Sequence, residues 1–354
     1  MFLLPAWAAV AAPSKPREPG QSLEVAWLVA GLALALLIGF RHEVGGDWGT
    51  YLAHYDDMVG APLQEVLEKG DPGYYLLMWL ATHVNGGVYL VNLVSGVLFS
   101  AGLVAFCRIQ PRPWLALSVA VPYMVIVVGM GYSRQGLALG LAMLGLVGLA
   151  RKSNLQFVLC VALAATFHKS AVLLVPLAVL STPHGKLWTG LWVGITAAVL
   201  YYVLLAESVE KLVVNYVEAE YQSEGAAVRL AMNAVPAAAL LLWRKHFVLT
   251  LQDRNLWTML SLLALASLAV LALSPSSTAV DRVALYMIPL QLFVFSRLPD
   301  VLGGGQKVRT WVVAIVMYYA LVQFVWLFYA THSQYWLPYR FYLLQDYWSQ
   351  TPVI

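Results

Sequence analysis

Three arginines of this sequence lie at the ends of long apolar segments, where a permanent positive charge is costly. Arg134 stands in Gly-Tyr-Ser-Arg-Gln-Gly after an apolar run, Arg282 opens another such run, and Arg41 ends the first one. A charge near membrane depth faces a cavity or a partner by default, and a guanidinium in the first turn of a helix opposes the helix dipole. We therefore expect these arginines to bind an anion. The alternatives are a local ion pair of Arg282 with Asp281 and ordinary interfacial anchoring of Arg41.

A histidine marks the junction of two apolar segments that are too short to cross a membrane unaided, 155–168 and 170–181. This residue, His168, stands in Ala-Ala-Thr-Phe-His-Lys-Ser, beside Lys169. Histidine is a general base near neutral pH, and apolar surroundings keep it in the neutral form that a base needs. A single histidine is more often structural, but its place at this junction favours catalysis. We predict that His168 is a general base.

An acidic residue with aromatic neighbours lies in the polar stretch after the first apolar segment. If 47–58 is helical, Asp47, Tyr51 and Tyr55 share one face by their spacing, and Trp48 adjoins them. Aromatic faces pack on sugar C–H surfaces, while a carboxylate accepts hydroxyl protons. This combination suits a carbohydrate, and the alternative is a solvated acidic loop. We expect Asp47 to be a second catalytic candidate or a sugar anchor.

The composition excludes several classes of protein. Of the 354 residues, 61% are hydrophobic and 11% are charged, whereas a soluble domain has about 25% charged residues. The cysteines, Cys107 and Cys160, lie in or beside apolar runs and imply no disulfide framework. Intrinsic disorder, a nucleic-acid-binding domain and a disulfide-stapled secreted fold are therefore excluded, and the sequence is that of a polytopic membrane protein.

Hydropathy predicts a single all-α domain, residues 1–354, with about eleven transmembrane helices. The expected spans are 23–40, 87–106, 113–132, 133–150, 155–168, 170–181, 187–206, 226–243, 255–273, 281–296 and 310–330. Outside them, 1–22 is expected to be an interfacial segment, and 41–86 an outer loop in which 73–85 forms a half-helix. The amphipathic stretch 207–225 is expected to lie on the outer surface as a cover or lid.

The placement of the charges predicts the orientation. If the N-terminus is cytoplasmic, the loops on that side hold 13 of the 21 basic residues and four of the 18 acidic ones. This is the positive-inside bias. The C-terminus then faces the periplasm, and Arg134, His168 and Asp47 all belong to the outer side.

In the order and spacing of these residues, the chain resembles the EpsG family of Wzy-type bacterial polysaccharide polymerases. The motifs that carry the resemblance follow one another in order over residues 25–340. They are Arg41-x-x-x-Gly45-x-Asp47 with Tyr51, Gly73-Tyr74, Ser133-Arg134-Gln135-Gly136, Phe167-His168-Lys169-Ser170, Arg282-x-x-x-Tyr286 and Pro338-Tyr339. At the position where the family pattern has Glu-x-Gly, this chain has Asp71-Pro72-Gly73, which we interpret first as a turn.

The resemblance implies polymerisation of undecaprenyl-pyrophosphate-linked oligosaccharides at the outer face of the bacterial inner membrane. In that reaction Arg134, Arg282 and Arg41 would bind the pyrophosphate, and His168 would be the base, with Asp47 in reserve. Further substrate contacts are expected from Tyr51, Tyr74, Gln135, Lys169, Tyr286, Tyr339 and Arg340. The expected partners are the lipid-linked oligosaccharide, membrane lipids, and a flippase and chain-length regulator of the same pathway. No cofactor or metal is expected, because the sequence has no zinc-spaced Cys/His cluster.

Three other functions remain open on the sequence. An O-antigen-ligase-like transferase would pass a finished chain to another acceptor with much the same chemistry. A glycosyltransferase using a lipid-monophosphate sugar would take Asp47 as its base, and as a metal ligand if it used one. A lipid-linked oligosaccharide flippase would do no chemistry, but transporters often have inverted repeats, and we find no repeat in this sequence.

Overall fold

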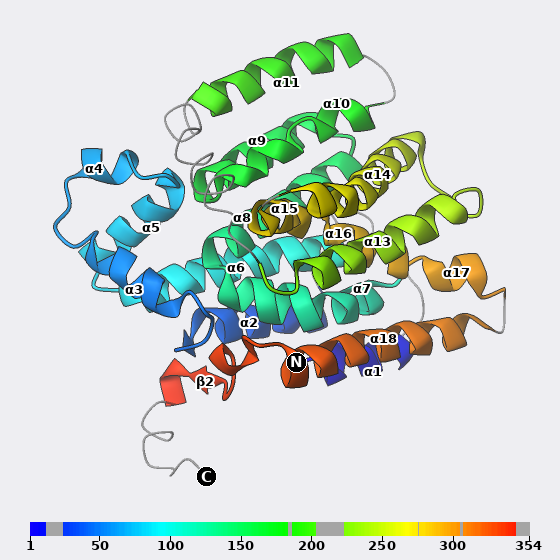
Figure 1. Ribbon diagram of the computed structural model, residues 1–354, viewed down its shortest axis with the longest axis horizontal. Coiled ribbons are helices and arrows are strands. Elements are labelled where there is room, and N and C mark those ends of the chain that lie inside the picture. The colour runs from blue at the N-terminus through cyan, green and yellow to red at the C-terminus, as the bar shows by residue number, and fades with distance from the viewer. Residues whose placement is uncertain (12–23, 183–185, 203–222, 275, 305–306, 345–354) are drawn as a thin grey trace.

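The computed structural model describes residues 1–11, 24–182, 186–202, 223–274, 276–304 and 307–344. Over these residues the chain is a helical bundle, in which most helices run side by side along the longest dimension (Figure 1). The helices are α1 (Leu3–Ala11), α2 (Val25–Gly39), α3 (Trp48–Asp56), α4 (Leu63–Leu67), α5 (Pro72–His83), α6 (Gly87–Arg108), α7 (Pro113–Ala120), α8 (Ser133–Ala150), α9 (Asn154–Phe167), α10 (Leu177–Ser181), α11 (Lys186–Leu200), α13 (Ala226–Leu242), α14 (Leu251–Leu273), α15 (Ser277–Ala284), α16 (Pro289–Phe295), α17 (Leu298–Leu302) and α18 (Val308–Tyr329). A π-helical stretch (Val121–Gly129) continues α7, and the strands β1 (Arg41–His42) and β2 (Arg340–Phe341) have two residues each.

Four of the described helices, α6, α8, α14 and α18, are long and apolar enough to cross a membrane. A fifth span results if Ser277–Met287 and Pro289–Leu302, which are bent by 42°, count as one. The shorter apolar helices, of 10–17 residues, are Val25–Gly39, Pro113–Gly129, Asn154–Phe167, Lys169–Ser181, Leu187–Leu200 and Ala226–Leu242. Each expected span thus has its apolar helix, and the all-α membrane-type fold is as expected. That the shorter helices cross the membrane, and which side each terminus faces, stay predictions.

The contact between α6 and α8 lies at the centre of the bundle and depends on glycine. A Cβ atom on Gly102 would lie 1.9 Å from the carbonyl oxygen of Gly140, and one on Gly140 would lie 2.5 Å from Cα of Phe99. Small residues of this kind allow two membrane helices to approach closely. The glycines therefore hold α8 against α6, and with it the position of Arg134 in the first turn of α8.

We expect Gly140→Ala to destabilise the protein by roughly 1–3 kcal/mol, the usual cost of forcing an extra methyl group into a packed core. The atoms nearest to the new methyl group are all backbone atoms of α6, which have little freedom to move aside. Gly194→Ala in α11 is the matched control, because nothing lies within 4 Å of a Cβ atom there. Thermal unfolding in detergent measures both variants, and an unchanged midpoint for Gly140→Ala would contradict the close contact.

The two undersized apolar segments form a closed hairpin. α9 has 14 residues and is therefore about 21 Å long, which is less than the ~30 Å thickness of a bilayer core. At the open end of the hairpin, the side-chain amide of Asn154 donates to the hydroxyl of Thr182 at 2.8 Å. At the tip, His168 joins α9 to the 3-10 turn Lys169–Leu174. The hairpin thus carries His168 at its tip.

The outer-loop helices and the C-terminal strand gather at one end of the bundle. α3, α4 and α5 lie together at the left of Figure 1, with β2 at the lower left. β1 pairs with β2 in antiparallel fashion, so that Arg41 lies opposite Phe341 and His42 opposite Arg340. The segment that follows the last long helix therefore returns to the residues that follow the first.

Two expected surface segments lie largely outside the described residues. Of 207–225 only 223–225 are described, and of 1–22 only 1–11 are described. In the described part, α1 packs against α7 and α18. The cover over the outer surface and the interfacial position of the N-terminal segment stay predictions.

Candidate functional site

A buried carboxylate joins three segments of the chain at the outer-loop end of the bundle. Nη1 of Arg134, in the first turn of α8, donates to Oδ2 of Asp71 at 2.9 Å. The backbone N–H of Lys169, at the tip of the hairpin, donates to Oδ1 of Asp71 at 3.2 Å. Asp71 is only 5% exposed, whereas the Arg134 side chain is 26% exposed. The guanidinium is thus fixed at one edge and partly open to a ligand.

Asp71 is the residue of this site whose role the sequence interpretation missed. The turn expected at Asp71-Pro72-Gly73 is present and begins α5. The Asp71 side chain, however, makes no capping hydrogen bond to the first turn of α5. Burial raises the pKa of the Asp71 carboxyl above its ordinary value, although Arg134 and the amide of Lys169 act to lower it. The signal in the sequence was the acidic residue itself, at the position where the family pattern has glutamate.

His168 directly precedes Lys169, whose backbone N–H bonds to Asp71. The His168 side chain is buried, with the residue 8% exposed. Its backbone is extended, with φ −155° and ψ 108°, and its Nδ1 lies 2.6 Å from Oγ of Ser170. The hydrogen bonds of Asp71 and Gln135 bring the cationic residues Arg134, Lys169 and Arg282 to the same part of the fold. An anion that bound among these cations would lie next to the imidazole.

Arg282 and Tyr286 enter the same site from the broken helix formed by α15 and α16. Gln135, next to Arg134 on α8, donates its side-chain amide to the carbonyl of Arg282 at 2.5 Å. Tyr286 is buried, and its hydroxyl lies near Ser170. The predicted set Arg134, Gln135, His168, Lys169, Arg282 and Tyr286 is therefore brought together by three elements.

Asp281, the residue with which a local ion pair of Arg282 is the alternative explanation, has a partner on another helix. The Asp281 carboxylate accepts hydrogen bonds from Nε and Nη2 of Arg229 in α13, at 2.7 and 2.8 Å. Ser223 adds a hydrogen bond to the same carboxylate at 3.1 Å. The Asp281 carboxylate therefore ties α15 to α13.

Arg41 lies next to the start of α8 and is 1% exposed. Its guanidinium donates to the carbonyl of Ile38 at 2.5 Å, to the side-chain oxygen of Asn92 at 3.0 Å and to the hydroxyl of Ser133 at 2.6 Å. Ser133 directly precedes Arg134. The structure therefore places Arg41 as a buried support for the start of α8, and direct contact of Arg41 with an anion stays a prediction.

Two tyrosines of the outer loop that are predicted to contact substrate, Tyr51 and Tyr74, lie near Arg134. The Tyr51 ring is 6.0 Å from the guanidinium of Arg134 and 5.8 Å from the Tyr74 ring, and both tyrosines are buried. Asp47, at the start of α3, is partly exposed. Within the described residues, its side chain makes no hydrogen bond or ion pair. Asp47 is therefore available to a sugar hydroxyl.

The remaining two predicted residues take part in the tie between β1 and β2. The hydroxyl of Tyr339 donates to the carbonyl of Leu37 at 2.6 Å, and Arg340 forms an ion pair with Glu43. Their polar groups hold the C-terminal segment against the end of α2, so substrate contacts by Tyr339 and Arg340 stay predictions.

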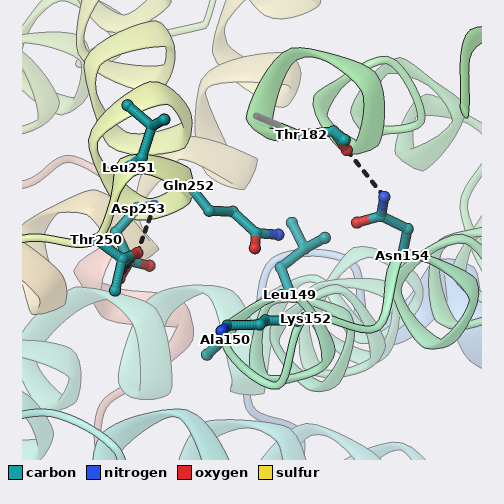
Figure 2. Close-up of a pocket in the computed structure, with 9 residues that line it drawn as sticks. All are labelled: Leu149, Ala150, Lys152, Asn154, Thr182, Thr250, Leu251, Gln252 and Asp253. Atoms are coloured by element: carbon teal, nitrogen blue, oxygen red, sulfur yellow. Dashed lines mark hydrogen bonds between the residues drawn. The ribbon is translucent and has the colours of Figure 1, made fainter. Parts of the chain in front are cut away.

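A pocket with a volume of about 450 Å³ lies at the opposite end of α8. Figure 2 shows its lining, which includes Leu149, Lys152, Thr182 and Asp253. None of the residues predicted to do chemistry lines it. In the part of the chain that the structure describes, no three His, Cys, Asp or Glu side chains lie close enough together to hold a metal ion. The candidate site is therefore the cluster of cations around His168.

Comparison with known proteins addresses the family to which this chain belongs. The model of the EpsG family matches residues 24–341, nearly the whole chain. No curated protein and no solved structure matches it. The resemblance carried by the ordered motifs is thus confirmed. The chain belongs to the EpsG family, and this membership, consistent with a Wzy-type polymerase, indicates polysaccharide polymerase activity.

Proposed function

We propose that this protein polymerises oligosaccharide repeat units that are linked to undecaprenyl pyrophosphate, at the outer face of the bacterial inner membrane. The growing glycan leaves its lipid pyrophosphate and is transferred to a hydroxyl at the non-reducing end of the next lipid-linked unit. The observation that supports this most is that Arg134, Lys169 and Arg282, from three separate elements, are brought together with His168 through Asp71 and Gln135. A flippase that delivers the units and a chain-length regulator are the proposed partners.

The leaving group requires concentrated positive charge. Pyrophosphate gains negative charge as its bond to the anomeric carbon breaks, and preorganised cations stabilise such charge most strongly where water is excluded. A guanidinium group can donate two parallel hydrogen bonds to a pair of phosphate oxygens. Arg134 and Arg282 are the proposed clamp, and Arg41 adds positive potential from below. In this proposal the clamp acts without a metal ion.

The acceptor hydroxyl has to lose a proton as its oxygen attacks the anomeric carbon. His168 is the proposed base, and because Nδ1 is next to Ser170, Nε2 is the nitrogen that takes the proton. An imidazolium among three cations is unfavourable until the departing pyrophosphate lies between them. Proton transfer and loss of the leaving group are therefore coupled, and a single displacement inverts the anomeric configuration. Asp47 is the proposed anchor for the acceptor sugar.

Asp71→Asn is expected to lower kcat/KM for polymerisation roughly 10- to 100-fold, because a hydrogen bond to a charged group contributes about 1.5–3 kcal/mol and holds Arg134 in place. Asparagine still accepts from the backbone N–H of Lys169, so the turn is kept. Glu65→Gln is the control, since Glu65 pairs with Lys69 at 3.8 Å on the exposed outer loop, where such a pair contributes little. Equal rates for the two variants would contradict the positioning of Arg134 by Asp71.

Mass analysis of lipid-linked glycans in cells that lack this protein tests the proposed function. A polymerase predicts that single repeat units accumulate on undecaprenyl pyrophosphate at the outer face. Long chains left on the lipid would identify a ligase, and units trapped at the inner face a flippase. Units that lack one sugar would identify a transferase that uses a lipid-monophosphate sugar, with Asp47 as its base.

A further inference from the structure

The broken helix that carries Arg282 and Tyr286 needs outside support to hold these side chains in place. α15 ends at Ala284, a 3-10 turn follows over Leu285–Met287, and α16 begins at Pro289. The two halves meet at 42°. Proline has no N–H, so the regular hydrogen-bond ladder is interrupted at this point. The position of the residues at the break therefore depends on contacts with neighbouring helices.

Two side-chain amides from different helices hold the backbone at the break. Gln135 of α8 donates to the carbonyl of Arg282 at 2.5 Å. Asn233 of α13 donates Nδ2 to the carbonyl of Ala284 at 2.9 Å. The second carbonyl lies midway in sequence between Arg282 and Tyr286. Asn233 thus holds the chain at the point from which both side chains reach the site.

The Asn233 amide is itself oriented by a chain of buried polar groups. Gln291 of α16 donates Nε2 to Oδ1 of Asn233 at 2.7 Å, and Tyr319 of α18 donates its hydroxyl to Oε1 of Gln291 at 2.7 Å. All three residues are at most 2% exposed. Apolar side chains would fill the same space without the cost of removing polar groups from water. Because every one of these hydrogen bonds is made, the buried polar groups fix the orientation of the Asn233 amide.

We propose that Asn233 is a positioning residue for polymerisation, which acts through Arg282 and Tyr286 and is itself oriented by Gln291 and Tyr319. The inference rests on the proposed function, because it takes Arg282 as part of the pyrophosphate clamp. Loss of the hydrogen bond to Ala284 lets the break shift, and a misplacement of about 1 Å can cost about a hundredfold in rate.

The effects of substitutions on kcat/KM are expected to decrease along this series of hydrogen bonds. Asn233→Ala lowers kcat/KM roughly 10- to 100-fold, Gln291→Leu less, and Tyr319→Phe a few-fold, because each step is further from the break. Ser118→Ala is the control: its buried hydroxyl donates to the carbonyl of Trp114 at 2.8 Å, within α7. Tyr319→Phe removes a single hydroxyl and keeps the proposal testable if Asn233→Ala does not fold.

A double-mutant cycle separates positioning from general stability. The readout is the Kd for inorganic pyrophosphate, measured on the purified full-length protein. Asn233→Ala is expected to weaken binding about tenfold in the wild-type background and less than threefold in the Arg282→Ala background, since residues that act through one another are not additive. Equal weakening in both backgrounds would overturn the proposal.

Hydrogen exchange of the backbone around 284–288 provides a readout that needs no substrate. Asn233→Ala is expected to speed exchange there, and the control Ser118→Ala is not. Unchanged exchange would overturn the proposal, as would faster exchange with unchanged turnover. If the wild-type protein does not bind inorganic pyrophosphate, the proposed clamp fails, and the exchange result together with turnover still decides whether Asn233 positions the break.

Discussion

Replacing His168 by alanine is expected to lower polymer formation by about 10²–10⁴-fold, the usual contribution of a general base. The imidazole is buried, so no bulk water replaces it as a base. Binding of the lipid-linked donor is expected to remain, because the cations of the clamp are intact. Purified protein with lipid-linked repeat units, resolved by product length on a gel, measures turnover, and a pull-down with labelled lipid measures binding.

His83→Ala is the matched control for this prediction. His83 is exposed, and among the described residues it forms hydrogen bonds only within its own helix, with Nδ1 2.8 Å from the carbonyl of Trp79. It is expected to leave turnover unchanged. If His168→Ala retains more than a tenth of wild-type turnover, His168 is not the base. Asp47→Asn would then be the variant to examine, because Asp47 is the remaining catalytic candidate.

Arg134→Ala is expected to lower kcat/KM by about 10²–10³-fold, comparable to the loss of a preorganised donor that stabilises developing charge. Arg134→Lys restores only part of the rate, because an ammonium keeps the charge but loses the paired geometry for phosphate. Inhibition by inorganic pyrophosphate is expected to weaken in the same order. Kinetics with the lipid-linked donor, with and without added pyrophosphate, measures both effects.

The control for this second prediction is another arginine paired with an acid. Arg112 forms an ion pair with Asp300 at 2.5 Å at the start of α7, far along the bundle from Arg134. Arg112→Ala is expected to leave the pyrophosphate inhibition constant unchanged. Polymer production that survives both Arg134→Ala and Arg282→Ala would contradict the pyrophosphate clamp.

Much of the site could be predicted because its residues break local patterns. A cation after a long apolar run, as at Arg134, or a histidine between two undersized apolar segments, as at His168, departs from what hydropathy alone favours. Such departures are visible in a short window of sequence. The hairpin of α9 and α10 followed from segment length for the same reason, and the ordered motifs then led to the EpsG family.

The partners of these residues could not be predicted in the same way. Asp71 reads as part of a turn, but its carboxylate meets Arg134, 63 residues further along the chain. Asp281 adjoins Arg282 in sequence, but it pairs with Arg229 of α13. Asn233 and Gln291 read as single polar residues in apolar helices, and nothing in their neighbourhood in sequence indicates that they form a chain with Tyr319.

The sequence by itself determined the all-α membrane class, the apolar helices and the charged residues that lie at their ends. These follow from composition, hydropathy and charge, which are properties of neighbouring residues. Only the tertiary structure decided that Arg41 is enclosed as a support, that Arg134 is held by Asp71, and that the break after Ala284 is held from α8 and α13. Such contacts depend on how helices far apart in the chain pack against one another, and no local pattern encodes that packing.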